Sequence, residues 1–257
     1  MTYCPANIAL RIAYDGTLYK GWQDNNKHRS IEKELRTVLE KILRHQVKLE
    51  ASSRTDAGVH AEEQIVRFYT PKQKLDTEKL RHSIHALLPD DIAVISVEKK
   101  PFLFHPTTDS YGKTYHYYLC TSNVQLPHFR HYSWHVPQMK DIDLLMQAAS
   151  YFEGEHDFAA FCGQLSLQSY TCTRRYLSRI ELIPLPDDRF RIEIEGEKFL
   201  YKMVRNLVGT MVDIARGRLC IDDIEEILSS KLRSKAGVCA PAHGLFLHKI
   251  HYNPLFR

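Results

Sequence analysis

Residues 46–70, QVKLEASSRTDAGVHAEEQIVRFYT, place two strand-like runs on either side of a polar loop. The first run, QVKLEA, alternates polar and apolar residues, which is the period of a half-buried strand. The second run, QIVRFYT, is rich in the β-branched and aromatic residues that favour strands. The intervening SSRTDAGVHA contains a glycine and small polar residues, so we expect a loop between two strands.

Helices and strands alternate around this loop. Ser30 is a candidate helix N-cap, because apolar residues recur at helical spacing after it, and Pro89 stops a second helix. The expected elements are a strand over 7–14, a helix after Ser30, strands over 46–51 and 64–70, a helix over about 76–88 and a strand over 92–98. This β-α-β-β-α-β order is that of a ferredoxin-like unit.

The second portion also mixes helices with strands. The expected elements are a strand over 113–120, a helix over about 141–152, strands over 177–184 and 190–195, a long helix over about 198–216, a short acidic helix over 221–229 and a strand over 245–252. We therefore expect an α+β protein with two similar ferredoxin-like or RRM-like domains, residues 1–108 and 109–257, whose sheets are mainly antiparallel.

Composition excludes several classes of protein. Of the 257 residues, 44% are hydrophobic and 26% charged, which excludes a disordered or collagen-like chain. The six cysteines form no C-x-x-C pair, which argues against a zinc site or a disulfide framework. We see neither a signal peptide nor an apolar run of about 20 residues, so we expect a soluble, cytoplasmic protein without a membrane segment.

The formal net charge of +4 conceals local segregation of charge. Residues 16–54 carry nine Lys or Arg against five acids, and residues 198–218 carry five against one. Acidic residues gather instead in 187–197 and 222–226. We expect the two basic segments to line a cleft that neutralises phosphates, with an affinity that falls steeply as salt rises.

The loop Arg54-Thr55-Asp56-Ala57-Gly58-Val59-His60 is the first candidate for chemistry. A carboxylate on a glycine-containing loop can act as a nucleophile, a general base or a metal ligand. The alternative is an ordinary turn, in which Asp56 accepts backbone hydrogen bonds while Arg54 and His60 lie on the surface. The H-x-E at His60 lacks the P-C-x-x-C of zinc deaminases, and Gly112-Lys113-Thr114 lacks the first glycine of a P-loop.

Two further groups combine basic and aromatic residues. Tyr201 and Arg205 are spaced as i, i+4 neighbours on the expected long helix, where Lys202 and Arg205 could complement an acid or a phosphate, or simply be solvated. On the strand over 113–120, Lys113 and Tyr115 could bind and stack an unpaired base, although tyrosines also pack well in any half-buried strand.

Taken together, these residues form an ordered set of motifs that spans nearly the whole chain. The motifs are YDG-TLYKGWQ (14–23), SRTDAGVHA (53–61), LPDDI (88–92), FH (104–105), KTYHY (113–117), FEGEHDF (152–158), MVRNLVG (203–209) and APAHGL (240–245). They resemble the signature segments of the tRNA pseudouridine synthase A family. RTDAGVH followed by MVRN-VG is the most specific part of the resemblance.

The resemblance implies an isomerase that converts uridine to pseudouridine at positions 38, 39 or 40 of the tRNA anticodon stem-loop, without cofactor or metal. It implies that Asp56 initiates cleavage of the glycosidic bond, either by attacking the sugar or by abstracting a proton to give a glycal. Tyr115 is implied to stack on the base and to act as a possible general base, and Arg205 to pair with Asp56. Arg54 is implied to hold the flipped-out nucleotide. With the residue types above, this makes Arg54, His60, Lys113, Tyr115 and Lys202 the expected substrate-binding residues.

Three positions depart from the family pattern, and two other functions compete with the enzyme. Ser53 replaces a glycine, Thr107 an arginine and Glu32 a glutamine, which we expect to change the grip on RNA more than the chemistry. The competing functions are a tRNA-binding protein without turnover and an aspartate-dependent hydrolase of a small substrate. The family also forms homodimers, so we expect tRNA and a second copy of the chain as partners.

Overall fold

The computed structural model describes residues 5–139 and 141–253, and they form a mixed α/β fold of two compact units. The first unit takes in the chain up to Tyr111 together with residues from Leu247 onward, and the second unit spans Gly112–Phe246. The predicted division at residue 108 stays a prediction.

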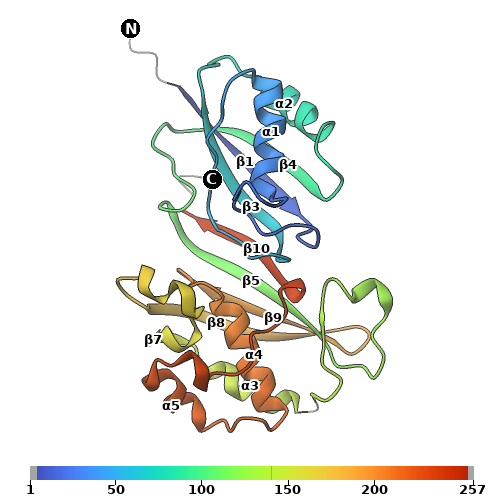
Figure 1. The fold of residues 1–257 in the computed structure, drawn as a ribbon, viewed down its shortest axis with the longest axis vertical. Coiled ribbons are helices and arrows are strands. Elements are labelled where there is room, and N and C mark those ends of the chain that lie inside the picture. Colours follow the sequence, from blue (N-terminus) through green and yellow to red (C-terminus); the bar gives the residue numbers. More distant parts are fainter. Residues whose placement is uncertain (1–4, 140, 254–257) are drawn as a thin grey trace. The chain divides into compact units, whose positions relative to one another are not determined.

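The first unit follows the predicted order of elements. It contains β1 (Ala6–Tyr14), α1 (Ile31–Leu43), β2 (Glu50–Ala51), β3 (His60–Thr70), α2 (Thr77–His85), β4 (Ile92–Lys100) and most of β10 (Leu245–Tyr252). The strands lie in the order β4-β1-β3-β10, and β2 also pairs with β3. β1 is antiparallel to both β3 and β4, and α1 and α2 lie side by side (Figure 1).

The second unit is a sheet in the order β5-β9-β8-β7, with β6 parallel to β5. Its elements are β5 (Ser110–Cys120, from Gly112 on), η1 (Pro127–Phe129), β6 (Trp134–His135), α3 (Ile142–Ser150), β7 (Gly154–Asp157), η2 (Ala159–Phe161), η3 (Gln164–Ser169), β8 (Arg174–Leu185), β9 (Arg189–Gly196), α4 (Met203–Ala215), α5 (Asp223–Ser230), η4 (Arg233–Lys235) and η5 (Ala242–Gly244). The β5/β9, β8/β9 and β7/β8 pairs are antiparallel. α3 packs against α4 (Figure 1).

Local sequence explains the best-predicted elements. α1 begins where the Ser30 side chain accepts a hydrogen bond from the Lys33 backbone N–H, as expected of an N-cap. Its buried face is made of Ile31, Leu35, Val38, Leu39 and Leu43 at helical spacing. β10 covers the predicted residues 245–252.

Several predicted boundaries are wrong. The long helix expected from residue 198 begins only at Met203, because Lys202 adopts the left-handed conformation with φ of 60°. Tyr201 therefore lies before α4, and it is not a helical neighbour of Arg205. The strand expected over 46–51 shrinks to Glu50–Ala51, and the four-residue strand β7 was not predicted.

The cysteines of the described residues are free thiols. They are Cys120, Cys162, Cys172, Cys220 and Cys239, and Cys4 lies outside the described part of the chain. None of the helices in that part is both long enough and apolar enough to cross a membrane.

Candidate functional site

The loop of residues 52–59, called the Asp56 loop below, connects β2 to β3. Its side chains alternate in exposure, since Ser53 and Thr55 are buried, Arg54 is exposed and Asp56 is half-buried. Successive side chains of extended backbone point to opposite sides. Ser53 and Thr55 therefore serve as the inner attachment of the loop, while Arg54 and Asp56 lie on its solvent side.

Gln64 of β3 fixes the first half of the Asp56 loop. Its Oε1 accepts hydrogen bonds from Ser52 Oγ at 2.7 Å and from the Ser53 backbone N–H at 3.2 Å. Its Nε2 donates to the Ser53 carbonyl at 2.6 Å. The Gln64 side chain is fully buried, so it binds both backbone groups of Ser53 much as a neighbouring strand would.

Thr55 and the residues beside it are fixed from the β1–α1 connection. The hydroxyls of Thr55 and Tyr14 form a buried hydrogen bond of 2.8 Å, and the Trp22 backbone N–H donates to the Thr55 carbonyl at 3.0 Å. Gly21, at φ of +93°, allows this approach, because a Cβ there would lie 2.6 Å from the Thr55 carbonyl oxygen. The Gly58 N–H also donates to the Tyr19 carbonyl at 3.2 Å.

His60, expected to contact RNA, is only 1% exposed. Its Nδ1 lies 3.1 Å from the Gly16 backbone nitrogen and 3.1 Å from Asp15 Oδ1. A neutral Nδ1 accepts from Gly16, whereas a protonated Nδ1 donates to Asp15. In either state His60 joins the end of the Asp56 loop to the end of β1, which favours a positioning role over direct contact with RNA.

Tyr19 is part of the β1–α1 connection, and its buried side chain holds that connection in place. It is buried, its hydroxyl donates to Asp91, and the Arg29 guanidinium lies 4.4 Å from the centre of its ring. Burial, followed by the hydrogen bond and negative charge of Asp91, raises the pKa of Tyr19 far above its usual value. Tyr19 therefore stays a neutral donor at every physiological pH.

Tyr115 lies on β5 in the second unit, paired with Ile194 of β9. Its ring is 8% exposed and contacts Phe199 edge-on, with centroids 4.9 Å apart. Tyr117 shares this face and is fully buried. Its hydroxyl donates to the Pro241 carbonyl at 2.8 Å, and burial raises its pKa well above the usual value. Tyr115 is thus the more accessible of the two rings.

Arg205 lies on the first turn of α4 and is held by Ala240. Its Nε donates to the Ala240 carbonyl at 2.7 Å, and the Ala240 N–H donates back to the Arg205 carbonyl at 3.1 Å. Lys202 lies at the N-cap, with its Nζ 5.1 Å from the centre of the Tyr201 ring. Asp56 and Arg205 belong to different units, so their predicted ion pair stays a prediction.

A polar face of α4, which the sequence analysis missed, explains how Ala240 is fixed. Asn206, Thr210 and Asp213 are all buried, and they bind residues 233–240, called the return segment below. Asn206 Oδ1 accepts from Arg233 at 3.0 Å, Thr210 Oγ1 from the Gly237 N–H at 2.9 Å, and Asp213 Oδ2 from the Val238 N–H at 2.9 Å. The spacing i, i+4, i+7 within an apolar helix is the signal that could have revealed this face.

Ion pairs neutralise part of the basic segment 16–54. Arg29 pairs with Glu34 and Asp91, and Arg36 pairs with Asp24. Among the described residues, no ion pair involves the exposed bases Lys20, Lys27, Lys33, Lys41, Arg44 and Arg54. These six positions therefore carry the positive charge that this segment can offer to a polyanion.

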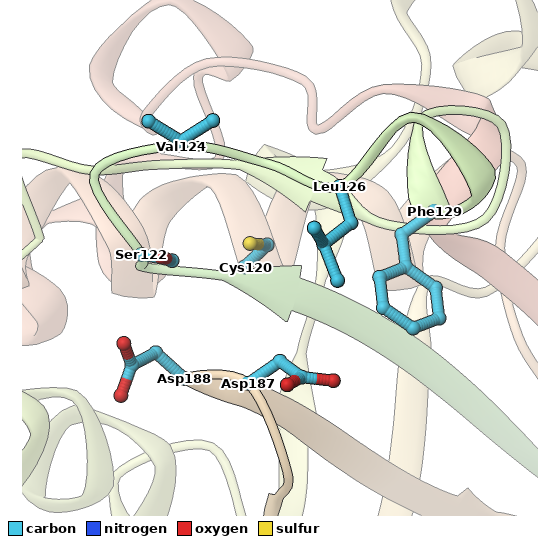
Figure 2. Close-up of a pocket in the computed structure, with 7 residues that line it drawn as sticks. All are labelled: Cys120, Ser122, Val124, Leu126, Phe129, Asp187 and Asp188. Carbon is cyan, nitrogen blue, oxygen red and sulfur yellow. The ribbon is translucent and has the colours of Figure 1, made fainter.

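A cavity of about 260 Å³ lies in the second unit (Figure 2). Leu126 and Phe129 line it on one side, and Asp187 and Asp188 of the β8–β9 turn line it with carboxylates that point away from each other (Figure 2). Arg189 lies 3.5 Å from the centre of the Phe129 ring. None of the residues that carry the predicted chemistry lines this cavity.

One pair of possible metal ligands lies within the first unit. His248 Nδ1 contacts the Glu62 carboxylate. Catalytic zinc sites use three protein ligands, so these two residues by themselves supply too few.

Sequence comparisons with known proteins all indicate the same family. A family model described as tRNA pseudouridine synthase matches residues 11–109 and 148–253. The chain is 49% identical over 246 residues to tRNA pseudouridine synthase A 2 of Protochlamydia amoebophila, covering 96% of this chain and 94% of that protein. It is 38% identical to tRNA pseudouridine synthase A of Thermoanaerobacter sp., covering 96% and 99%.

Similarity to solved structures is remote. A chain in the crystal structure of a Cbf5-Nop10-Gar1 complex is 14% identical, with a TM-score of 0.34, and the match covers 82% of this chain and 54% of that one. A likeness this low does not bear on function.

Proposed function

The chain belongs to the tRNA pseudouridine synthase family and is an isomerase that acts on tRNA, and from this premise we propose that it modifies uridine at positions 38, 39 or 40 of the anticodon stem-loop. The observation that carries the proposal is the Asp56 loop. Buried hydrogen bonds hold its inner side chains, and a half-buried carboxylate lies on its solvent side.

In the proposed reaction, Asp56 starts the cleavage of the bond between N1 of uracil and C1′ of ribose. It does so by attacking the sugar or by removing a proton to give a glycal. The uracil keeps the bonding electrons, rotates, and forms a new bond from C5 to C1′. C5 then loses its proton and N1 gains one, so every atom of the nucleotide is conserved and the chemistry calls for no external oxidant or activated donor.

Tyr115 and the arginines have distinct proposed roles. We assign Tyr115 to stacking on the target base, which is worth about 1–3 kcal/mol per base, and to removal of the C5 proton. A flipped-out uridine loses a few kcal/mol of stacking and pairing, which this contact offsets. Arg54, exposed beside Asp56, holds the flipped nucleotide, and Arg205 favours the ionised form of Asp56.

The proposal goes beyond the family assignment in the fold of the units, the RNA-binding surface, and the cell compartment and oligomeric state. Each unit is ferredoxin-like, which the antiparallel β4-β1-β3 order with β2 beside β3 supports in the first unit. The basic segments line an RNA-binding cleft that carries Asp56 and Arg205. The enzyme acts in the cytoplasm as a homodimer.

Replacement of Asp56 tests the proposal directly. Asp56→Asn should abolish pseudouridine formation, while the affinity for tRNA stays within about tenfold, because the change removes a charge without changing shape. The assay maps pseudouridine at each site in tRNA transcripts that carry uridine at position 38, 39 or 40.

Asp143→Asn is the matched control, since Asp143 is exposed on α3 and lies outside the loop and the family motifs. It should leave the rate unchanged. Continued turnover by Asp56→Asn would show that another group is the nucleophile. Wild-type binding without product at all three positions would favour the binding protein, and absence of salt-dependent RNA affinity would favour the hydrolase.

A further inference from the structure

Asp91 lies in the LPDDI motif (88–92), immediately before β4, and takes no part in the proposed chemistry. Its carboxylate accepts hydrogen bonds from the Tyr19 hydroxyl and from Arg29 Nη1, the latter at 3.2 Å. Its carbonyl accepts from the Asp15 N–H at 3.0 Å. Asp91 therefore binds the β1–α1 connection at its beginning, in its middle and near its end.

The β1–α1 connection, residues 15–30, contains neither helix nor strand. Gly21, near its middle, lies against the Asp56 loop, because a Cβ there would be 3.1 Å from the Asp56 carbonyl carbon. The Gly21 carbonyl accepts from the Ile31 N–H of α1 at 3.3 Å. Irregular backbone satisfies its polar groups through such contacts with neighbouring elements. Contacts that fix the connection therefore also fix the backbone against which Asp56 packs.

Two hydrogen bonds between the connection and the Asp56 loop lie on either side of Asp56. On one side, the Trp22 N–H donates to the Thr55 carbonyl at 3.0 Å. On the other side, the Gly58 N–H donates to the Tyr19 carbonyl at 3.2 Å. A displacement of the connection at Tyr19 or Trp22 would therefore move the backbone that carries the Asp56 carboxylate.

Tyr19 links Asp91 to this backbone contact. Its side chain is 2% exposed, and the Arg29 guanidinium lies 4.4 Å from the centre of its ring. The same guanidinium pairs with Asp91 at 3.2 Å and with Glu34 at 2.8 Å. A buried hydroxyl is normally hydrogen-bonded, and a bond to an ionised acceptor is stronger than one between neutral groups. Asp91 thus fixes Tyr19 at its hydroxyl, while the Tyr19 carbonyl fixes Gly58.

We propose that Asp91 is a positioning residue for the reaction. By binding Tyr19 and Arg29, it fixes the β1–α1 connection, which in turn holds the Asp56 carboxylate in its reactive position. The proposal rests on the proposed function, because it takes Asp56 to be the reacting group. In this role Asp91 acts through Tyr19 and does not touch the substrate, so it affects the rate of reaction more than the affinity for tRNA.

Single-turnover kinetics and tRNA binding separate these two quantities. Asp91→Ala should lower the rate constant of pseudouridine formation about tenfold and leave the affinity for tRNA, measured in the Asp56→Asn background, within about twofold. Asp91→Asn keeps an acceptor for the Tyr19 hydroxyl but loses the charge that pairs with Arg29, so it should retain more of the rate. Combining Asp91→Ala with Tyr19→Phe should cost less than the product of the two single losses, because both remove the same hydrogen bond.

Amide hydrogen exchange measures the anchoring of the Asp56 loop independently of turnover. In Asp91→Ala, the Trp22 and Gly58 amides should exchange about tenfold faster, since each donates across the contact between the connection and the loop. The amides that pair β1 with β3 should keep their protection. A general loss of stability would instead speed exchange in the strands as well.

Two control variants separate positioning from stability. Glu98→Ala removes an exposed carboxylate of β4 that pairs with Lys100, and it should change neither the rate nor the exchange. Leu80→Ala removes a buried side chain of α2, so it should lower the unfolding temperature and leave the rate constant unchanged.

The proposal is wrong if Asp91→Ala forms pseudouridine at the wild-type rate, or if it loses rate and affinity by the same factor. It is also wrong if exchange quickens equally throughout the first unit, or if Leu80→Ala loses as much rate at an equal loss of stability. Turnover by Asp56→Asn would overturn the proposed assignment of the nucleophile alone. In that event, the exchange of Trp22 and Gly58 still decides whether Asp91 holds the loop.

Discussion

The two units fix their candidate catalytic residues in contrasting ways. In the first unit, side chains from two strands reach into a short loop, with Gln64 binding Ser53 and Tyr14 binding Thr55. In the second unit, one polar helix face binds the return segment, and Ala240 of that segment holds the Arg205 side chain. The Asp56 carboxylate is thus positioned by contacts within a short loop. The Arg205 guanidinium is positioned by Ala240, which lies 35 residues away in sequence.

Because of this difference, we expect defects in the two units to affect different properties, stability in one case and catalytic rate in the other. The polar face of α4 organises a long stretch of the second unit, so a defect there should mainly lower the free energy of unfolding. Gln64 organises only the Asp56 loop, so a defect there should mainly lower the rate.

Gly209→Ala should be the most destabilising change. A Cβ at Gly209 would lie 1.7 Å from the Val238 carbonyl oxygen, so the backbone of the return segment must move. We expect a loss of about 3 kcal/mol, well beyond the roughly 1 kcal/mol that alanine gains over glycine in a helix. Denaturant unfolding monitored by circular dichroism measures it.

Gly217→Ala is the matched control at the end of the same helix. Its Cβ would meet nothing within 4 Å, but the φ of +69° is strained for alanine. We expect a loss of only about 1–2 kcal/mol. Equal midpoints for the two variants would mean that close packing on the return segment does not stabilise the unit.

Gln64→Leu should affect catalysis more than binding. It leaves two buried backbone groups of Ser53 without their hydrogen bonds, at a cost of about 2 kcal/mol. With the loop loosened, kcat should fall at least tenfold while KM changes little, because Gln64 is buried and acts through Asp56. Steady-state kinetics on tRNA measures both constants.

Gln64→Glu tests whether the amide donor matters. Its carboxylate keeps the acceptor oxygen but repels the Ser53 carbonyl until it is protonated, and burial raises a carboxyl pKa. Relative to wild type, this variant should therefore recover activity as pH falls. If the activity of Gln64→Glu were lower than that of wild type by the same factor at every pH, Gln64 would contribute only through packing.

Asp157→Asn should give the smallest effect, and one that depends on pH. Burial opposes ionisation of Asp157, but hydrogen bonds from Lys231, Thr173 and the Ala159 N–H outweigh it and hold the pKa below its usual value. The carboxylate therefore stabilises the fold above the unfolded-state pKa, near 4, and this contribution is lost as pH falls through the folded-state pKa.

Thermal unfolding should thus show a deficit of about 1 kcal/mol for Asp157→Asn at neutral pH, which disappears in acid. Glu155→Gln, which breaks an exposed pair with Arg174, should show no measurable deficit at either pH. A deficit for Asp157→Asn that persists at pH 2 would contradict the assignment to charge.

Local patterns predicted most of the secondary structure. Ser30 and the apolar spacing after it located α1, and the alternation in 245–252 located β10. The start of α4 was wrong because nothing local marks Lys202 as a left-handed residue. β7 was missed because its four residues gain their strand conformation only from pairing with β8.

The candidate site was predicted only in part, because local sequence does not show contacts between distant residues. Motifs singled out Asp56 and Arg205, but the residues that hold them act through contacts between distant parts of the chain. Gln64 reads as one polar residue in a strand, and only the structure shows that it binds Ser53. The burial of His60 follows from its position over Gly16, which the sequence alone does not indicate.

The first unit is built from two separate segments of the chain, and this has a consequence for biosynthesis. Its sheet includes β10, which the ribosome makes only after the entire second unit. At about 5–20 residues per second, the nascent first unit waits on the order of 10 s with the β3 edge uncovered. The second unit, continuous in sequence, can complete itself first, and β10 then completes the sheet of the first unit.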